Sequence, residues 1–214
     1  RHRWVYAGER VDSPKSIKPG EAVEIRDIQD HFLARGYGNP HSQISFRAVS
    51  FNRADENPMS VEFLTGRLVQ AWNYRFRSGF KKSFRLCYSE ADQMPGIILD
   101  RYLFSKNAQT YQVFSYQLLT AGMDRAFRAN ENWKTIFKNL VDESLRLQIS
   151  SIDWDHTLIL QRNDVNIRKL EGLQVEEPVI LKTVDQEDLT SIDIIVQNVL
   201  DSAQTLEFHV NLIE

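Results

Sequence analysis

The stretch from Phe84 to Arg101, which reads FRLCYSEADQMPGIILDR, constrains the fold of this chain more than any other. An apolar segment at 84–88 runs into a polar corner and then, through Pro95-Gly96, into a second apolar run at 97–99. Proline fixes its own φ and glycine tolerates a positive φ, so this dipeptide favours a turn, and the Ile-Ile-Leu after it favours a buried strand. The stretch therefore predicts a strand, a tight corner and a strand.

Bulk composition limits the class of protein. The chain has 214 residues, of which 42% are hydrophobic and 26% charged, as in a soluble globular protein of one large or two small domains. No apolar run approaches the roughly 20 residues that span a bilayer, and no signal segment opens the chain, so we expect the cytoplasm. A single cysteine, Cys87, excludes an internal disulfide and a multi-cysteine metal site; its place in an apolar strand favours a buried side chain over a nucleophile.

Charge is distributed unevenly. Residues 1–101 hold 16 Lys and Arg against 12 Asp and Glu, whereas residues 102–214 hold 10 against 17. No acid lies between Glu62 and Glu90, a segment with six cations: Arg67, Arg75, Arg77, Lys81, Lys82 and Arg85. Cations without counter-charges attract phosphate, so this segment is a candidate polyanion-binding surface. The alternative is a solvated helix face with its loop.

Short strands separated by turns are expected in the first 50 residues, at 22–27, 32–34 and 43–51, which favours a small β barrel. Residues 35–40, Arg-Gly-Tyr-Gly-Asn-Pro, are rich in turn formers and predict irregular structure. Arginine beside glycines can approach RNA phosphate, and Asn and Gln can contact base edges. The candidate RNA-binding residues here are Arg35, Asn39, Ser42, Gln43 and Arg47. Equally, Gly and Asn can simply form the turn while Arg35 pairs with a nearby acid.

A helix is predicted from Asn57, as N-cap, and Pro58, as first helical residue, to about Ser78. Its apolar positions recur at three- and four-residue spacings, and Arg75 and Arg77 lie on its remaining surface. Further strands are expected at 110–116, 157–160, 178–183, 192–197 and 206–212, with helices at 118–128 and after Asn130. This order predicts an α+β domain with a terminal strand pair and acidic loops.

Several carboxylates invite a catalytic interpretation. Glu90, Asp92 and Asp100 flank the turn of the opening stretch, but no nucleophile or metal cluster accompanies them, so we favour turn-forming roles. Asp153, Asp155 and His156 are more typical of solvated or capping groups than of a metal site. We therefore expect no bound metal.

Three stretches resemble one family. ExDxMPGIIxDRY at 90–102 resembles the segment that opens the central domain of bacterial 23S rRNA cytosine-C5 methyltransferases, which use S-adenosylmethionine. Residues 32–47, FLARGYGNPHSQISFR, resemble the N-terminal PUA domain of that family, and RKLEGL at 168–173 resembles its RxxEGL near the end of the central domain. The opening RHRWVYAG is also similar to the family's RHPWVFxG, with Arg3 in place of the proline. The three matches follow the family's order over most of the chain.

The resemblance implies a domain organisation. It predicts a PUA-like barrel at 1–56, a linking helix at 57–79 and a β-β-α-β-β type central domain at 80–214. Both ends are expected to be cut, and a Rossmann-like domain that binds S-adenosylmethionine is expected after 214. No GxGxxG, P-loop or catalytic Pro-Cys motif occurs in the chain, so we expect this piece to be inactive alone and to carry no catalytic or cofactor-binding residue.

The resemblance implies rRNA as the partner, with neither DNA nor a membrane, and it leaves a homodimer open. The candidate RNA-binding set is Arg35, Asn39, Gln43, Arg47, Arg75, Arg77, Lys81 and Lys82. One alternative is a stand-alone, non-enzymatic RNA-binding or scaffold module. A third is a small hydrolase that uses the carboxylates at 90–100. Sequence downstream of Glu214 would separate the first two, since the methyltransferase requires GQKTG and a nucleotide-binding glycine loop there.

Overall fold

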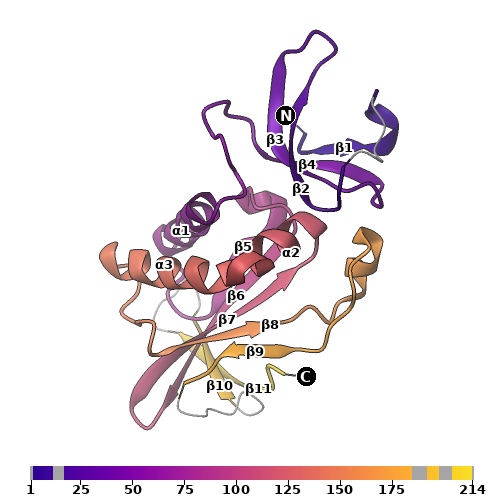
Figure 1. Cartoon of the computed structure of the whole chain (residues 1–214). Helices are drawn as coiled ribbons and strands as arrows, with labels where there is room; N and C mark the ends of the chain where they lie inside the picture. The colour runs from indigo at the N-terminus through magenta and orange to yellow at the C-terminus, as the bar shows by residue number, and fades with distance from the viewer. Residues whose placement is uncertain (1, 12–16, 185–191, 198–203, 214) are drawn as a thin grey trace.

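A computed structural model describes residues 2–11, 17–184, 192–197 and 204–213. They form a small N-terminal sheet and a larger central sheet that carries the helices on one face (Figure 1). The predicted α+β class is confirmed. The acidic loops expected between the last strands, at 185–191 and 198–203, lie outside the described residues.

The N-terminal sheet is antiparallel, with strand order β1-β4-β3-β2. Its strands are β1 (Trp4–Tyr6), β2 (Glu21–Arg26), β3 (Phe32–Gly38) and β4 (Ile44–Ser50), and η1 (Ala7–Glu9) follows the first. Its own core is small, with three fully buried apolar residues, Ala34, Phe46 and Ala48. The ladder among the described residues is an open path, so the closed barrel stays a prediction.

The predicted irregular segment at 35–40 is mostly strand, and that prediction was wrong. β3 continues to Gly38, and Gly36 pairs with Ala48 of β4. A Cβ at Gly36 would lie 1.9 Å from the carbonyl oxygen of Arg47. Glycine is therefore needed here for close strand approach, and turn formation does not explain it.

The linking helix α1 spans Val61–Arg77, and its start differs from the prediction. Ser60 is the N-cap, and its Oγ accepts a hydrogen bond from the amide of Phe63 at 3.2 Å. Asn57 instead closes the preceding turn by accepting from the amide of Met59. The Asn-Pro pair belongs to a turn before the helix, because a better-placed serine follows it.

The central sheet contains seven strands in the order β11-β10-β6-β7-β8-β9, with β5 paired to β6 beside β10. The strands are β5 (Phe84–Tyr88), β6 (Ile97–Lys106), β7 (Gln109–Leu118), β8 (Thr157–Gln161), β9 (Val179–Lys182), β10 (Ile192–Gln197) and β11 (Thr205–Val210). The strand, corner and strand predicted at 84–101 is confirmed: β5 pairs antiparallel with β6, and η3 (Ser89–Asp92) forms the corner.

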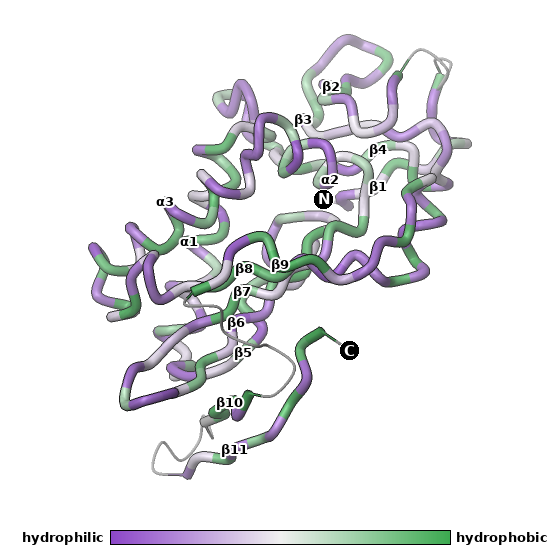
Figure 2. The backbone as a smooth tube through the Cα atoms, turned by 60° about the horizontal axis from the view of Figure 1, so that its bottom comes forward, coloured by the Kyte–Doolittle hydropathy of each residue, from purple (hydrophilic) through white to green (hydrophobic). Residues whose placement is uncertain are grey.

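Two helices cross from β7 to β8, which is its parallel neighbour. They are α2 (Ala121–Arg128) and α3 (Asn132–Arg146), joined by η4 (Ala129–Glu131). Together with α1 they cover one face of the sheet (Figure 1). Figure 2 shows hydrophilic and hydrophobic segments alternating along α1 and α3, as expected for helices with one face on a sheet.

The main core lies between these helices and the sheet. Phe137 of α3 stacks on Phe114 of β7 at a centroid distance of 5.6 Å, and Trp72 of α1 meets the same Phe114 edge-on. A second core on the other face joins β7 and β8 to the C-terminal strands, through Val113, Leu158 and Ile194. Burial on both faces explains why the three central residues of β8, Leu158 to Leu160, are all apolar.

The N-terminal sheet is anchored to the central domain by Tyr37 of β3. Its side chain is fully buried in the main core, and its hydroxyl donates to the carbonyl of Pro95 at 2.7 Å. The same oxygen lies 2.8 Å from Thr120 Oγ1 at the start of α2. Gly122 of α2 packs directly against the tyrosine ring. The two units therefore share one core and are not joined by the linking helix alone.

The described residues include neither a helix that could span a membrane nor a cluster of metal-ligating side chains. None of the described helices has both the length and the apolar character that a membrane span requires. No three His, Cys, Asp or Glu side chains in the described ranges come together as metal ligands would. Cys87 is fully buried, and burial raises the pKa of its thiol, which makes it a core side chain.

Candidate functional site

Five segments of the chain enclose a cleft of about 760 Å³ between the N-terminal sheet and the central domain. They are β1, the β3–β4 connection with the first half of β4, the corner from η3 to Gly96, the β7–α2 connection, and η5 (Asn166–Glu171), which stands beside the N-terminal sheet in Figure 1. The lining residues are Trp4, Tyr6, His41, Ser42, Gln43, Ile44, Arg47, Ser89, Glu90, Gly96, Leu119, Thr120, Ile167, Lys169, Leu170 and Glu171. We call this the interdomain cleft.

Glu171, at the end of η5, ties the two sides of the cleft together. Its side chain is 4% exposed and accepts hydrogen bonds from Asn39 Nδ2 at 2.9 Å and Ser42 Oγ at 2.8 Å. Arg47 Nη2 forms an ion pair with it at 2.9 Å. Three donors from the N-terminal sheet thus converge on one buried carboxylate of the central domain.

The position of η5 is set by Arg168. This side chain is 1% exposed, and its Nε donates to the carbonyl of Gln174 at 2.7 Å. Its Nη2 pairs with Asp124 of α2 at 3.0 Å, and its Nη1 donates to the carbonyl of Leu118. A buried guanidinium therefore fastens the RKLEGL segment to α2 and β7, and Glu171 is presented to the cleft.

Arg47 bridges the two carboxylates of the cleft. Besides Glu171 it contacts Glu90 Oε1 at 3.3 Å, and its guanidinium lies 5.6 Å from the ring of Trp4. Trp4 Nε1 donates to the same Glu90 oxygen at 2.7 Å. The Nε of Arg47 is buried without a hydrogen-bond partner among the described residues. The floor of the cleft is thus a charged network with one unused donor.

Glu90 is held in its ionised form. Burial would raise its pKa, but hydrogen bonds from Ser89 and Trp4 and the charge of Arg47 outweigh this, so the pKa lies below its ordinary value. A depressed folded-state pKa stabilises the fold above the unfolded-state pKa, and this contribution is lost as the pH falls through the folded-state pKa.

We therefore expect Glu90→Gln to cost about 1 kcal/mol of unfolding free energy at pH 7. The difference from wild type should shrink below about pH 4, because protonation then removes the same charge. Urea unfolding from pH 3 to pH 7 measures this. Glu177→Gln, which removes an exposed carboxylate that forms no ion pair among the described residues, is the matched control. A Glu90→Gln difference that does not change with pH would contradict the assignment.

The walls of the cleft are apolar and accessible. Tyr6 is 42% exposed, Ile167 is 53% exposed and Leu170 is 71% exposed. Gln43 and Lys169 are also exposed, and their side chains make no hydrogen bond or ion pair within the described ranges. Exposed aromatic and apolar surfaces beside free amide and ammonium groups can stack a nucleobase and contact its edge.

Besides Arg47, which pairs with Glu90 and Glu171, two more of the predicted RNA-binding arginines are already engaged in the fold. Arg35 pairs with Glu24 at 2.7 Å and donates to the carbonyls of Arg53 and Asp55, as the scaffold alternative expected. Arg75 forms a bidentate pair with Asp92, with Nη2 and Oδ2 2.6 Å apart. Asn39 is likewise buried against Glu171. These three side chains hold the protein together, and we do not carry them into an RNA-binding assignment.

The segment without local acids is partly neutralised by the tertiary fold. Asp92 reaches Arg75, and Asp100 pairs with Arg85 at 2.8 Å. The expectation of six cations without counter-charges was therefore wrong for these two. Arg77 is exposed at the end of α1 and makes no ion pair in the described structure, whereas Lys81 and Lys82 line a different pocket.

The carboxylates of the opening stretch have structural partners. Asp92 also accepts from the amide of Tyr88, and Asp100 is bound by Nε and Nη2 of Arg85. With Glu90 held by Trp4 and Arg47, all three accept hydrogen bonds from the fold. The turn-forming and structural roles are the ones this geometry supports.

Sequence reasoning missed most of the apolar wall. Trp4 and Tyr6 lie in the opening WVY strand, and Ile167 and Leu170 lie in and beside the RKLEGL segment, where no binding residue is predicted. The available signal was the pair of apolar side chains, Ile167 and Leu170, within NIRKLEG, because large apolar residues in a short polar connection need a reason to be exposed.

Comparison with known proteins identifies the N-terminal unit first. Residues 1–51 match the family model described as a PUA-like domain. This confirms the domain predicted at the start of the chain.

Similarities over most of the chain are found to curated rRNA methyltransferases. The chain is 33% identical over 183 residues to ribosomal RNA large subunit methyltransferase I of Serratia proteamaculans, covering 83% of the chain and 39% of that protein. It is 31% identical over 209 residues to the protein of the same name from Photobacterium profundum, covering 91% of the chain and 46% of that protein. The chain is thus related to rRNA methyltransferases, and it spans less than half of their length.

Solved structures share the fold at low identity. A Streptococcus mutans protein, provisionally described as a SAM-dependent methyltransferase, matches with a TM-score of 0.58 and 9% identity over 98% of this chain and 44% of its own. Another protein with a provisional methyltransferase description, crystallised with SAH, matches with a TM-score of 0.61 and 11% identity, covering 98% of this chain and 44% of its own. At these identities the likeness concerns the fold alone.

Proposed function

We propose that this chain is the RNA-recognising portion of an S-adenosylmethionine-dependent rRNA methyltransferase of the cytosine-C5 type. Its role is to hold rRNA in the interdomain cleft while methyl transfer takes place in a domain outside these residues, where the cofactor also binds. The cleft supports this proposal because the three segments that resemble the methyltransferases in sequence all line it. The curated relatives, which are more than twice as long as their match to this chain, are consistent with it.

The chemistry of the cleft favours a single-stranded segment. Its width is set by two rigid units that share a core, and its walls offer Tyr6, Ile167 and Leu170 as surfaces for unstacked bases. Gln43 and Lys169 supply an amide and an ammonium group at the rim, for a base edge and a phosphate. Glu90 and Glu171 lie deeper and are occupied by Arg47, so they shape the floor.

We expect Tyr6→Ala to weaken binding of single-stranded rRNA fragments about tenfold, because one stacked base contributes about 1–3 kcal/mol. Fluorescence anisotropy with a labelled large-subunit rRNA fragment measures this. Tyr74→Ala, which removes an exposed tyrosine of α1 outside the cleft, should change the affinity less than twofold. Equal losses in the two variants would exclude the cleft as the base-binding surface.

Salt dependence tests the polyanion component of the same proposal. The logarithm of the association constant should fall with the logarithm of salt concentration with a slope of about −0.7 per phosphate neutralised on single strands. A small-subunit rRNA fragment of equal length should bind more weakly if the cleft distinguishes its target. A salt-insensitive curve would count against RNA as the ligand.

A further inference from the structure

A second pocket, of about 620 Å³, lies on the helix-covered side of the central sheet, at the ends of α1 and α3. It is lined by Lys81, Lys82, Arg101, Leu103, Thr110, Leu145, Gln148, Ile149, Ser150, Ser151 and Ile152. From Gly96 in the interdomain cleft to Arg101, β6 advances about 17 Å, so the two pockets are separate sites. We call this one the Arg101 pocket.

Arg101 is a buried cation without an acidic partner. It is 3% exposed, and no carboxylate among the described residues pairs with it. Its Nε donates to Gln112 at 2.8 Å, and its Nη1 donates to the carbonyl of Lys82 at 3.0 Å. Burying a charge without a counter-charge is costly, and neutral oxygens compensate it only in part.

The guanidinium is held rigidly in this position. Gln112, which accepts from Arg101, donates in turn to Thr157 Oγ1 at 2.9 Å on β8. The guanidinium carbon lies 5.0 Å from the ring of Trp72 in the main core. On the pocket side, Nη2 lies 3.3 Å from Ser150 Oγ. The charge is therefore placed by the sheet and the core, and it faces the loops at 81–82 and 148–152.

Two ammonium groups line the same pocket. Lys82 is half-buried, and its ammonium group makes no hydrogen bond or ion pair within the described part of the chain. Lys81 is exposed and donates to the carbonyl of Phe76 at 3.1 Å. No Asp or Glu is among the lining residues, whereas Gln148, Ser150 and Ser151 add polar donors. Three cations with hydroxyl and amide groups form the environment of an oxyanion.

We propose that the Arg101 pocket binds a phosphate group of the RNA backbone. Arg101 supplies a fixed charge at its base, and Lys81 and Lys82 close over the phosphate from the rim. The choice of RNA as the source of the phosphate rests on the proposed function above. The competing explanation is that Arg101 only ties the loops at 81–82 and 150 to the sheet, which requires no ligand.

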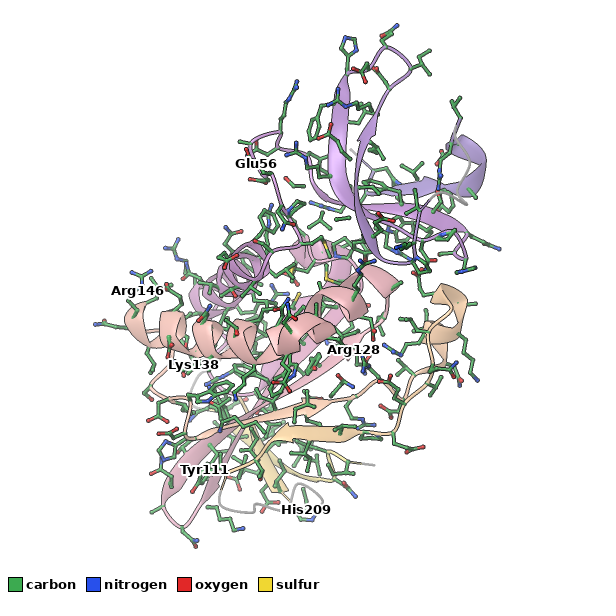
Figure 3. All side chains as sticks on the ribbon, viewed as in Figure 1. Glu56, Tyr111, Arg128, Lys138, Arg146 and His209 are labelled. Atoms are coloured by element: carbon green, nitrogen blue, oxygen red, sulfur yellow. The ribbon has the colours of Figure 1, made fainter. Side chains whose placement is uncertain are left out.

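The first experiment measures the oxyanion alone. Inorganic phosphate, compared with chloride at equal ionic strength, should raise the Tm of the chain by about 3 to 5 °C at ten times its Kd. The Lys81→Gln/Lys82→Gln variant should lose this shift. Lys134→Gln/Lys138→Gln removes two exposed cations of α3, where Figure 3 shows Lys138, and should keep it. Both double variants keep the buried Arg101, so misfolding caused by loss of this side chain does not affect the Tm comparison.

The second experiment uses single-stranded RNA of several sequences. Lys81→Gln/Lys82→Gln should weaken binding about tenfold at 50 mM salt, equally for all sequences, and reduce the salt slope by about 0.7. The α3 control variant should bind like wild type. Loss of the phosphate response with unchanged RNA binding would overturn the assignment to RNA. Absence of any phosphate response, with RNA affinity reduced only by Tyr6→Ala, would overturn this pocket and leave the proposed function standing.

Discussion

Glu171→Ala is expected to reduce the unfolding free energy of the chain by about 3 kcal/mol, one of the two largest effects predicted for a single substitution. The carboxylate is buried and receives Asn39, Ser42 and Arg47 from the opposite unit. Its removal leaves the guanidinium of Arg47 with Glu90 alone, leaves Ser42 Oγ without its carboxylate acceptor, and leaves Asn39 Nδ2 with only the backbone carbonyl of residue 171. Urea unfolding measures the loss, and hydrogen exchange should show increased opening at the β3–β4 connection.

The control for this prediction is Glu177→Ala, six residues along the chain. Glu177 is exposed and makes no ion pair with any residue that the structure describes, so its loss should change the unfolding free energy by less than about 0.5 kcal/mol. A double-mutant cycle of Glu171→Ala with Asn39→Ala should give a coupling of about 1 kcal/mol or more, because the two side chains share a buried hydrogen bond. Additive losses would show that the bond contributes little to holding the units together.

Gly122→Ala is expected to destabilise the chain by about 2 kcal/mol, although alanine is the better helix former. A Cβ at this position of α2 would lie 2.1 Å from Cγ of Tyr37, whose ring is fully buried and fixed through its hydroxyl. Overfilling a packed core typically costs 1–3 kcal/mol. Thermal and urea unfolding of the variant measure the effect.

Gly66→Ala, the same substitution in another helix, is expected to have the opposite effect on stability. Gly66 lies inside α1, and a Cβ there would meet nothing within 4 Å. With no clash, the helix propensity of alanine should stabilise the chain by about 0.5–1 kcal/mol. If Gly122→Ala also stabilises, the packing of α2 on Tyr37 described above is wrong.

Local patterns in the sequence predicted the elements better than their boundaries or their partners. Two apolar runs on either side of a polar corner with Pro-Gly placed β5, β6 and the corner between them, because buried strands are apolar and this dipeptide favours a turn. The helix start at Ser60 was not predicted because Asn57, which precedes a proline, and Ser60 are both suitable N-cap residues. Gly36 was assigned to a turn because the group that leaves no room for a side chain there, the backbone of Arg47, is eleven residues away in the sequence.

The candidate site was harder to predict than the secondary structure, because tertiary contacts bring its residues together. Arg101 alternates with Leu99 and Leu103, so its burial was implicit in the strand pattern, but its lack of an acidic partner was not. The pairing of Arg75 of α1 with Asp92 of η3 could not be predicted from the run of cations either. Resemblance identified the three segments, and only the fold showed that they line one cleft.

The burial of Tyr37 within the main core has a consequence for recognition. A hinge between the two units would have to withdraw an aromatic ring from its packing, so the cleft opens and closes little on its own. A ligand therefore meets a slot that already has its final shape, and little ordering entropy is lost from the protein on binding. Selectivity would then depend on whether a nucleic acid strand can adopt the shape of the interdomain cleft, because the cleft itself changes shape little.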